Sequence, residues 1–371
     1  MDEMYYYWLH NVPGIGRGTF QKILKYMSPK EMYLSDIENA DCFLTKKQKE
    51  GIKNGKKNWD IQKEWEKLQN RGIGVLGLKE KDYPEKLSKI PDPPPILYYK
   101  GRGDILNKPS VAVIGARVCS NYGSLAAKEL GKELAAMGIV VVSGMAKGID
   151  SICQSACLES GGESIGVLGS GVEVCYPPEN RFLYERLQMK GCLVSENLPH
   201  TPPNAGLFPL RNRIISGLAD VVVVIESREK SGTQITVDMA LEQGKEVYAL
   251  PGRITDPVSR GCNKLIKQGA GMILSPKEFV EEICPLLQIK YRQKQKKQKV
   301  ILSKEEQMIA EYLNVSMKTI EEIYQGVKIN FPEITINKVM EVVLEMQMKN
   351  MIKEKSGYYS IHNNLMHLER V

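Results

Sequence analysis

The sequence predicts an α/β protein whose central domain is Rossmann-like, with a doubly wound and mainly parallel sheet. In the middle third of the chain, six short β-branched runs begin 25 to 28 residues apart, and helical patterns separate most of them. Runs such as Val221–Ile225 are apolar without alternation, as expected for strands that are buried on both faces. Strands that alternate with helices at this spacing build βαβ units and hence a parallel sheet. The six runs begin at Val111, Ile139, Ser164, Cys192, Asp220 and Glu246.

Two smaller domains are predicted to flank the Rossmann-like domain, which spans residues 93–287. Residues 1–85 have helical patterns and are followed by the proline-rich turn Pro91–Pro95. Residues 288–299 (QIKYRQKQKKQK) carry six basic side chains and no acidic one, and so account for nearly all of the net charge of +7. Such a run usually forms a solvated linker, and a basic strap that assists phosphate binding is the alternative.

Residues 300–371 predict three helices followed by a hairpin, which is typical of a winged-helix-like domain. The first helix begins at a capping box, Ser303–Glu306. The third helix carries an apolar stripe, and a Ser356-Gly357 turn separates two strand-like arms near the C-terminus. The segment sums to a charge of −2. Because a surface that enters a DNA groove should be basic, a protein contact or a structural role is favoured here.

Composition and charge exclude several classes of protein. The chain of 371 residues is 42% hydrophobic and 26% charged, as in ordinary globular proteins. No apolar run approaches the ~18 residues of a membrane helix, and the first residues show no basic and apolar signal pattern. The eight cysteines form no CxxC pair, and the four histidines are scattered. We therefore expect a cytoplasmic protein with no metal site and no membrane partner.

The loops that follow the predicted strands are rich in glycine. The carboxyl ends of parallel strands meet at one edge of the sheet, where α/β proteins bind their ligands. Glycine lets backbone N–H groups approach an anion, and the N-termini of the following helices add further donors. Several such loops at one edge therefore predict a phosphate-binding site. The loops are Gly115–Arg117, Ser143–Asp150, Gly169–Glu173 and Lys230–Thr233.

The pattern of the loops favours a polyphosphate backbone over a nucleotide cofactor. The first loop is not G-x-G-x-x-G, and no G-x-x-x-x-G-K-[ST] occurs, so we expect no bound cofactor. Several cationic side chains together with backbone donors suit a nucleic-acid strand, although any single one could be a surface charge. The candidate ligands are Gly115, Arg117, Gly144, Lys147, Gly169, Ser170, Gly171, Arg211, Asn212, Arg213, Lys230, Ser231 and Gly232, with Tyr122, Tyr176 and Phe208 as candidates for base stacking.

These segments also resemble a known family. The strings IGARVCSNYG, SGMAKGID, GVLGSGVEVCYPPEN, FPLRNRIISGLADVVVVIE, KSGTQIT and YALPGRI are similar to the DNA-processing protein A family, also called DprA or Smf, over roughly residues 93–285. The resemblance implies a protein that binds single-stranded DNA, dimerises through this domain, and loads the RecA recombinase onto incoming DNA during natural transformation. It implies that Arg117 is a DNA ligand, and it points similarly to Gly169–Gly171 and Arg211–Arg213. The chain departs from the family pattern at Cys153-Gln154, where Ala-His is common, and at Val172-Glu173, where Leu-Asp is usual.

A second candidate contact lies near the N-terminus. The segment Val12–Leu24 (VPGIGRGTFQKIL) resembles a helix-hairpin-helix loop, in which a glycine turn directs backbone amides at a phosphate through a helix start. The pattern supports an accessory DNA contact and a simple packing turn equally. Residues 1–85 are accordingly predicted to form a helix-hairpin-helix or SAM-like domain.

The enzymatic alternative is a nucleotide-processing phosphoribohydrolase. Related Rossmann-like enzymes of that class carry a Pro-Gly-Gly-x-Gly-Thr-x-x-Glu loop whose Glu acts in glycosidic-bond cleavage. In this chain Thr236 stands at the Glu position, so the general acid/base is missing. A pure scaffold protein, with no affinity for oligonucleotides, is a third possibility. We predict a non-enzymatic protein whose partners are single-stranded DNA, a RecA-type recombinase and a second copy of itself.

Overall fold

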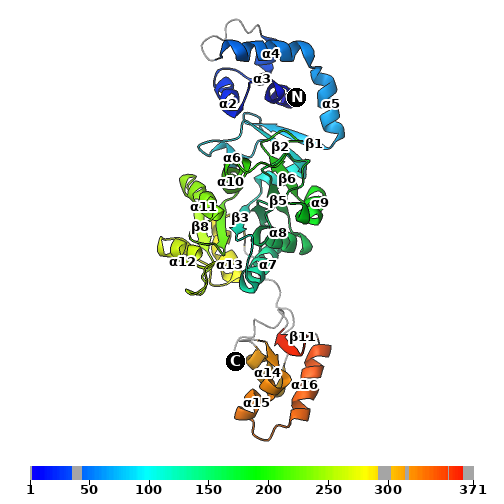
Figure 1. Ribbon diagram of the computed structural model, residues 1–371, viewed down its shortest axis with the longest axis vertical. Coiled ribbons are helices and arrows are strands. Elements are labelled where there is room, and N and C mark those ends of the chain that lie inside the picture. The colour runs from blue at the N-terminus through cyan, green and yellow to red at the C-terminus, as the bar shows by residue number, and fades with distance from the viewer. Residues whose placement is uncertain (1, 36–43, 291–301, 314–316, 350, 362–371) are drawn as a thin grey trace. The chain divides into compact units, whose positions relative to one another are not determined.

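The computed structural model describes residues 2–35, 44–290, 302–313, 317–349 and 351–361. The chain forms two compact units, residues 1–292 and 293–371 (Figure 1). Most of the expected basic linker, 288–299, lies outside the described residues. Within the described ranges, no helix combines the length and the apolar character that a membrane crossing requires.

The first unit is built on a nine-stranded sheet with the order β1-β2-β6-β5-β4-β3-β7-β8-β9. The strands from β6 to β9 in this order are all parallel, whereas β2 runs antiparallel to β6 and β1 antiparallel to β2. The predicted α/β fold with a mainly parallel sheet is confirmed, and each predicted run begins within one residue of a strand. The strands are β1 (Ile73–Gly77), β2 (Ile96–Gly101), β3 (Ser110–Gly115), β4 (Val140–Ser143), β5 (Ser164–Val167), β6 (Cys192–Ser195), β7 (Val221–Ile225), β8 (Glu246–Ala249) and β9 (Gly271–Met272).

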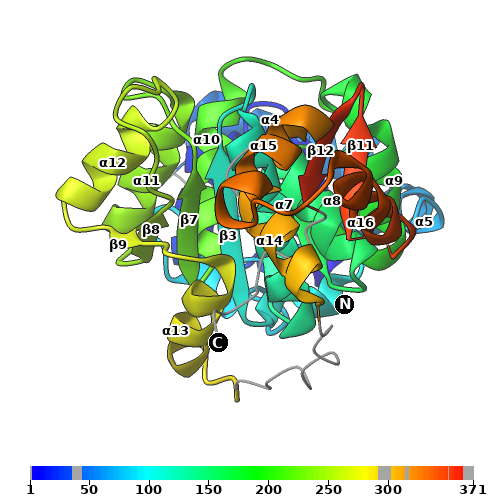
Figure 2. The same ribbon diagram turned by 90° about the horizontal axis from the view of Figure 1, so that it is seen from below.

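Helices cover both faces of this sheet (Figure 1; Figure 2). Ala112 and Ile114 of β3 point into one hydrophobic cluster, which α10 and α11 cover, while Val111 and Val113 point into another, which α7, α8 and α13 cover. Both side-chain directions of the strand are therefore buried, which explains the apolar runs without alternation. The helices are α6 (Glu85–Ser88), α7 (Asn121–Ala136), α8 (Ile149–Glu159), α9 (Arg181–Lys190), α10 (Leu207–Leu218), α11 (Gly232–Glu242), α12 (Arg260–Lys267) and α13 (Pro276–Leu286), with 3-10 turns η2 (Gly103–Asn107) and η3 (Pro178–Asn180).

The direction of winding reverses between β3 and β7. From β3 the chain proceeds outward through β4, β5 and β6, and from β7 it proceeds in the opposite direction through β8 and β9. The helices that follow β3 and β7 thus lie on opposite faces of the sheet, and their loops diverge at the carboxyl ends of the two strands. This switch point is where an open α/β sheet leaves room for a ligand.

The N-terminal helices have a hydrophobic core of their own that reaches the antiparallel edge of the sheet. Trp8, Phe20 and Ile52 are completely buried in it, together with Tyr98 of β2 and Val172 of the β5–α9 loop. The sequence analysis predicted helices in residues 1–85 but not β1, which pairs with β2. The helices are α1 (Glu3–Asn11), α2 (Arg17–Tyr26), α3 (Pro29–Leu34), α4 (Lys46–Asn58) and α5 (Ile61–Asn70).

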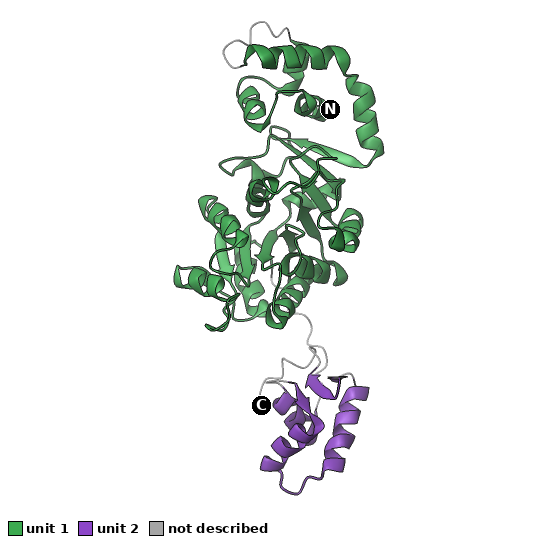
Figure 3. Ribbon diagram, in the orientation of Figure 1, with its two compact units in different colours: residues 1–292 green, residues 293–371 purple. Residues whose placement is uncertain are grey.

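The second unit contains three described helices and a small antiparallel sheet (Figure 3). Val339, Val342, Val343 and Met346 are buried along one side of α16, as the predicted stripe requires. The hairpin turns at Ser356-Gly357, both with positive φ. The elements are α14 (Lys304–Leu313), α15 (Ile320–Asn330), α16 (Ile336–Met348), β10 (Lys318–Thr319), β11 (Ile352–Lys355) and β12 (Tyr358–Ile361), and the sheet order is β10-β12-β11.

Candidate nucleic-acid interface

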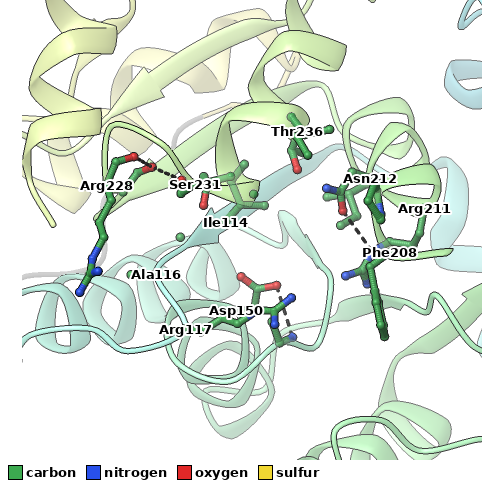
Figure 4. Close-up of a pocket in the computed structure, with 18 of the residues that line it drawn as sticks. Ile114, Ala116, Arg117, Asp150, Phe208, Arg211, Asn212, Arg228, Ser231 and Thr236 are labelled. Atoms are coloured by element: carbon green, nitrogen blue, oxygen red, sulfur yellow. Dashed lines mark hydrogen bonds between the residues drawn. The ribbon is translucent and has the colours of Figure 1, made fainter. Parts of the chain in front are cut away.

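A pocket of about 460 Å³ opens at the switch point of the sheet (Figure 4). It is lined by the loop after β3, the start of α8, one side of α10, the loop after β7 and the first turn of α11. In Figure 4, Phe208, Arg211 and Asn212 of α10 lie on one side of the pocket and Arg228 lies on the opposite side. The lining mixes apolar and polar side chains with arginines, which suits an anionic ligand that also carries flat apolar groups.

Arg117 and Arg228 are the exposed cations of this pocket. Arg117 follows β3 and Arg228 follows β7, so the two loops that diverge at the switch point each supply one. Among the described residues, neither guanidinium has a hydrogen-bond or ion-pair partner. Both charges are therefore available to a phosphate. The sequence predicted Arg117 as a ligand but not Arg228, which a search of every strand-following loop for arginine would have added to the candidates.

Arg211 lies at the floor of the pocket in a buried polar network. Its Nη1 donates to the carbonyl of Gly144 at 2.8 Å and also to that of Val167. Burial lowers the pKa of Arg211 to about 10, although the nearby Asp150 carboxylate opposes that shift. Arg211 therefore remains protonated at neutral pH, but much of its hydrogen-bonding capacity is already used inside the protein.

Asp150 is the acidic member of the pocket lining. Its carboxylate accepts from the backbone N–H of Gly144 at 3.1 Å and of Ala146 at 3.4 Å. Burial raises its pKa, against the effect of Arg211 and of these hydrogen bonds. The amide of Gly144, which we expected to face a phosphate, is thus directed at a carboxylate of the protein itself.

Arg213 lies away from the pocket, in contrast to its expected grouping with Arg117. Residues two apart on a helix are separated by about 200°, so Arg211 and Arg213 occupy opposite sides of α10. Arg213 binds Glu196 through both Nη atoms, at 3.0 and 2.5 Å, and its Nε donates to Asp92 at 3.1 Å. With 5% of its surface exposed, it forms a nearly buried ion-pair network between α10, the end of β6 and the proline-rich turn.

The third glycine loop, Gly169–Gly171, does not line the pocket. The amide of Gly171 donates to the carbonyl of Thr201 at 2.9 Å, and a Cβ on this residue would collide with the carbonyls of Leu198 and Pro199. The Ser170 hydroxyl is buried and donates to Val174 at 3.0 Å. These residues therefore serve close packing of the chain.

The remaining predicted ligands divide between the pocket and its surroundings. Asn212, Ser231 and Gly232 line the pocket, and the Ser231 hydroxyl is 2.8 Å from that of Ser227. Lys147 and Lys230 do not line it, and Lys147 forms an ion pair with Glu179 at 2.5 Å. Gly115 lines the pocket, but it is required by packing, since a Cβ there would meet the carbonyl of Ile225.

The N-terminus of α7, which follows the first loop, is already occupied by a carboxylate. Glu226 is buried, with a φ of 54°, and accepts hydrogen bonds from the backbone N–H of Ser120 at 2.8 Å and from the Ser120 hydroxyl. Gly123 leaves the space that this side chain fills. A dinucleotide would place its pyrophosphate at this helix start, so Glu226 excludes that binding mode. The sequence analysis reached the same exclusion from the loop pattern but did not identify Glu226.

An aromatic pair stands beside the pocket. The rings of Tyr176 and Phe208 stack with centroids 5.2 Å apart and planes 30° apart, and Phe208 also lines the pocket. Tyr122 is half exposed, and its hydroxyl donates to the carbonyl of Pro251 at 2.9 Å. An aromatic face beside an arginine rim is the combination on which unpaired bases stack.

Fold and site together define a doubly wound α/β protein that carries a polar, arginine-rimmed pocket at its switch point. Residues 74–284 match the family described as DNA recombination-mediator protein A. This match spans more than half of the chain, and the chain therefore belongs to that family, whose members are named DprA or Smf.

Relatives with known names share the central part of the sequence. The chain is 42% identical over 214 residues to DNA processing protein DprA of Bacillus subtilis, covering 57% of this chain and 72% of that protein. It is 42% identical over 202 residues to protein Smf of Escherichia coli, covering 54% of each chain. The family resemblance drawn from the sequence motifs is thereby confirmed.

Two solved structures share the fold. The X-ray structure of DNA processing protein A from Streptococcus pneumoniae superimposes with a TM-score of 0.67 at 32% identity, covering 78% of this chain and 99% of that one. A structure of DNA processing protein A from Helicobacter pylori, described for its single-stranded DNA binding mode, gives a TM-score of 0.53 at 30% identity. It covers 57% of this chain and 96% of the other.

Proposed function

We propose that this protein binds single-stranded DNA at the switch-point pocket, without cutting it, protects incoming DNA, and helps to load a RecA-type recombinase during natural transformation. It acts in the cytoplasm as a homodimer. The observation that carries the proposal is the pair of exposed guanidinium groups, Arg117 and Arg228, which two neighbouring loops supply to a pocket that also offers Phe208 as a stacking surface.

Three further observations support this function. Relatives over the same residues are named for DNA processing, and the Helicobacter pylori protein is described as binding single-stranded DNA. The filled N-terminus of α7 argues against a dinucleotide. The pocket lies where α/β proteins bind ligands, and its arginines can contact phosphates without regard to base sequence.

The proposal assigns different roles to the predicted ligands. Arg117 and Arg228 hold phosphates, with Asn212, Ser231 and the open first turn of α11 at Gly232 completing the contact. Arg211 forms the floor. We assign Arg213 and Gly169–Gly171 to the architecture that supports the pocket, because their polar groups are engaged inside the protein.

The second unit is proposed to be a winged-helix-like domain that contacts protein. The three helices and small sheet in its described residues have the order that such domains show. The two exposed acidic residues of α16, Glu341 and Glu345, argue against insertion into a DNA groove.

The direct test is a titration of oligo-thymidine at several salt concentrations with wild type and Arg117→Ala. With about three phosphate contacts per protomer, log K should fall with log salt at a slope near −2. Arg117→Ala should weaken binding about tenfold and flatten the slope by about 0.7, with no change in sequence preference. Lys190→Ala is the control, because Lys190 is an exposed cation at the end of α9, beside the amino end of β6. Equal affinity of Arg117→Ala and wild type would overturn the proposed site.

The same preparation tests the enzymatic alternative. Thr236 lines the pocket at the position where the related hydrolases carry Glu. The buried Asp150 carboxylate accepts hydrogen bonds from two backbone amides and lies near the charge of Arg211. We therefore expect no release of free base from nucleoside monophosphates. Release that is lost in Asp150→Asn would show that the protein is an enzyme.

A further inference from the structure

Basic charge is concentrated on two helices of the N-terminal module. Together α2 and α4 carry nine Lys or Arg residues and a single acidic residue, Glu50. By contrast, α5 carries basic and acidic residues in equal number. The exposed cations on the two basic helices are Lys22, Lys25, Lys46, Lys47, Lys53 and Lys57.

The two helices are adjacent at the glycine turn that resembles a helix-hairpin-helix loop. The Gln48 side chain of α4 donates to the Thr19 hydroxyl of α2 at 3.0 Å. Gly51 of α4 lies so close to the turn that a Cβ there would be 2.5 Å from the carbonyl of Pro13. The start of α4, with Lys46 and Lys47, is thus held beside the first turn of α2. Lys22 lies one turn further along α2, on the same side as Gly18 and Thr19, so it belongs to the same surface.

The turn itself presents open backbone on this surface. Ile15 is buried, whereas Gly14, Gly16 and Gly18 on either side of it are exposed. Gly14 has a φ of +85°, which explains its identity. Neither Gly16 nor Gly18 has a positive φ, and a Cβ on either would meet no atom within 4 Å. Backbone geometry therefore explains Gly14, and Gly16 is the N-cap of α2, where glycine is favoured over alanine, but neither packing nor geometry explains Gly18.

We infer that the α1–α2 turn and the facing lysines of α4 form a second DNA-backbone surface, which binds the strand beyond the pocket. The surface is defined by Gly16, Gly18, Lys22, Lys46 and Lys47. A glycine-lined helix start with no side-chain cap offers backbone N–H groups, and the lysines supply charge, so a sugar-phosphate backbone is the partner that fits. The inference rests on the proposed function only in taking the polyanion to be DNA.

A chain of ion pairs connects this surface to the pocket. Arg17, at the start of α2, binds Asp92 at 3.0 Å, and Asp92 also binds Arg213 of α10 at 3.1 Å. Gln21 of α2 donates to Asp92 at 2.8 Å and to the Pro93 carbonyl at 2.9 Å. Because α10 forms one wall of the pocket, these contacts fix the α1–α2 turn to a helix that also lines the pocket. Both surfaces can therefore bind one strand without a hinge between them.

The test uses the full chain and oligo-thymidine of two lengths, one that fills only the pocket and one several times longer. Lys22→Gln/Lys46→Gln/Lys47→Gln should weaken binding of the long oligonucleotide about tenfold and reduce its salt slope by about 2, with the short one unchanged. Lys63→Gln/Lys67→Gln on α5 is the control, since it removes exposed lysines from the same module outside this surface. Equal effects of the two variants, or none from the first, would overturn the inference.

Gly16→Ala/Gly18→Ala tests the turn independently of charge. Both substitutions are sterically free. Alanine favours the helix at position 18, whereas Gly16 is the N-cap of α2, where glycine is preferred to alanine, so the two effects oppose each other and the variant should fold with a stability close to that of wild type. Its affinity for the long oligonucleotide should nevertheless fall several-fold, because the methyl groups obstruct the approach of a phosphate. Unchanged affinity would show that the turn only packs. If only Arg117→Ala lost binding, the proposed function would be supported and the second surface rejected. If only the triple lysine variant and Gly16→Ala/Gly18→Ala lost binding, the second surface would be supported and the proposed pocket rejected.

Discussion

The carboxyl edge of the sheet has two regions with similar glycine-rich loops and opposite outcomes. At β3 and β7 the loops diverge around a pocket, and the two arginines on its rim are exposed. At β5 and β6 the chain fills the equivalent space: Gly171 packs against the carbonyls of Leu198 and Pro199, and Val172 enters the core of the N-terminal helices. Glu173 then forms an ion pair with Arg71 at 3.0 Å.

The difference shows that a glycine loop after a parallel strand does not define a site by itself. Where neighbouring loops turn to the same side, glycine allows another segment to pack closely. Where they turn to opposite sides, as at the switch point, the space between them remains open for a ligand. Helix α10 separates the two regions, with Arg211 facing the pocket and Arg213 facing the filled region.

The largest expected effect comes from the filled side of α10. Arg213→Ala leaves Glu196 nearly buried without its bidentate partner and removes one of the cations that bind Asp92. Breaking a buried ion pair in this way costs about 3–5 kcal/mol, which urea unfolding would measure as a loss in the free energy of unfolding. Affinity for oligo-thymidine, measured on the folded fraction, should remain unchanged. A variant of normal stability and weak DNA binding would instead make Arg213 a ligand, as the sequence analysis predicted.

The second largest expected effect is a pH dependence of stability in the N-terminal helices, whose core includes Val172 from the filled region. The His10 side chain is half-buried, and its Nδ1 lies 2.8 Å from the Tyr98 hydroxyl of β2. Burial lowers the pKa of His10 from 6.5 to about 4, so in this range the unfolded chain binds a proton that the folded one does not. The contribution of neutral His10 to the free energy of unfolding is therefore fully present above pH 6.5. The free energy of unfolding should fall by about 3 kcal/mol as the pH drops to 4.

All three tryptophans, Trp8, Trp59 and Trp65, lie in the N-terminal helices or at their boundaries. Tryptophan fluorescence therefore reports directly on the unfolding of these helices. His10→Gln should remove most of the pH dependence between 6.5 and 4. If the variant and wild type lose stability in parallel, other groups dominate and His10 is not the cause.

The sequence predicted the strands well because burial on both faces leaves an unbroken apolar run, as at Val221–Ile225. It also placed Arg117 and Gly232 at the carboxyl edge of the sheet, where both line the pocket, since the edge that a loop occupies follows from strand order alone. It did not show that Arg213 and Gly169–Gly171 lie outside the pocket lining, because their environment depends on segments distant in sequence, such as Asp92 and Pro199. For the same reason it could not reveal that Glu226 fills the start of α7. A local pattern shows where a loop begins but not what comes to lie against it.

Two glycines of equal prominence in the sequence give the most direct comparison of the two regions. At Gly171 an added Cβ would meet backbone carbonyls, which cannot move aside as a flexible side chain can, so Gly171→Ala should cost about 1–3 kcal/mol of unfolding free energy. At Gly232 a Cβ meets no atom within 4 Å, so Gly232→Ala should stay within about 0.5 kcal/mol of wild type.

DNA affinity should follow the opposite order. Gly232 lines the pocket at the first turn of α11, so its methyl group would hinder the approach of a phosphate and weaken oligo-thymidine binding a few-fold. Folded Gly171→Ala should bind as wild type does, because the Gly171 amide already donates to Thr201. Paired urea unfolding and oligonucleotide titration of the two variants would measure both effects. If both variants lost stability and neither lost affinity, glycine at the switch point would serve packing as it does at β5 and β6, and the distinction between the two regions would disappear.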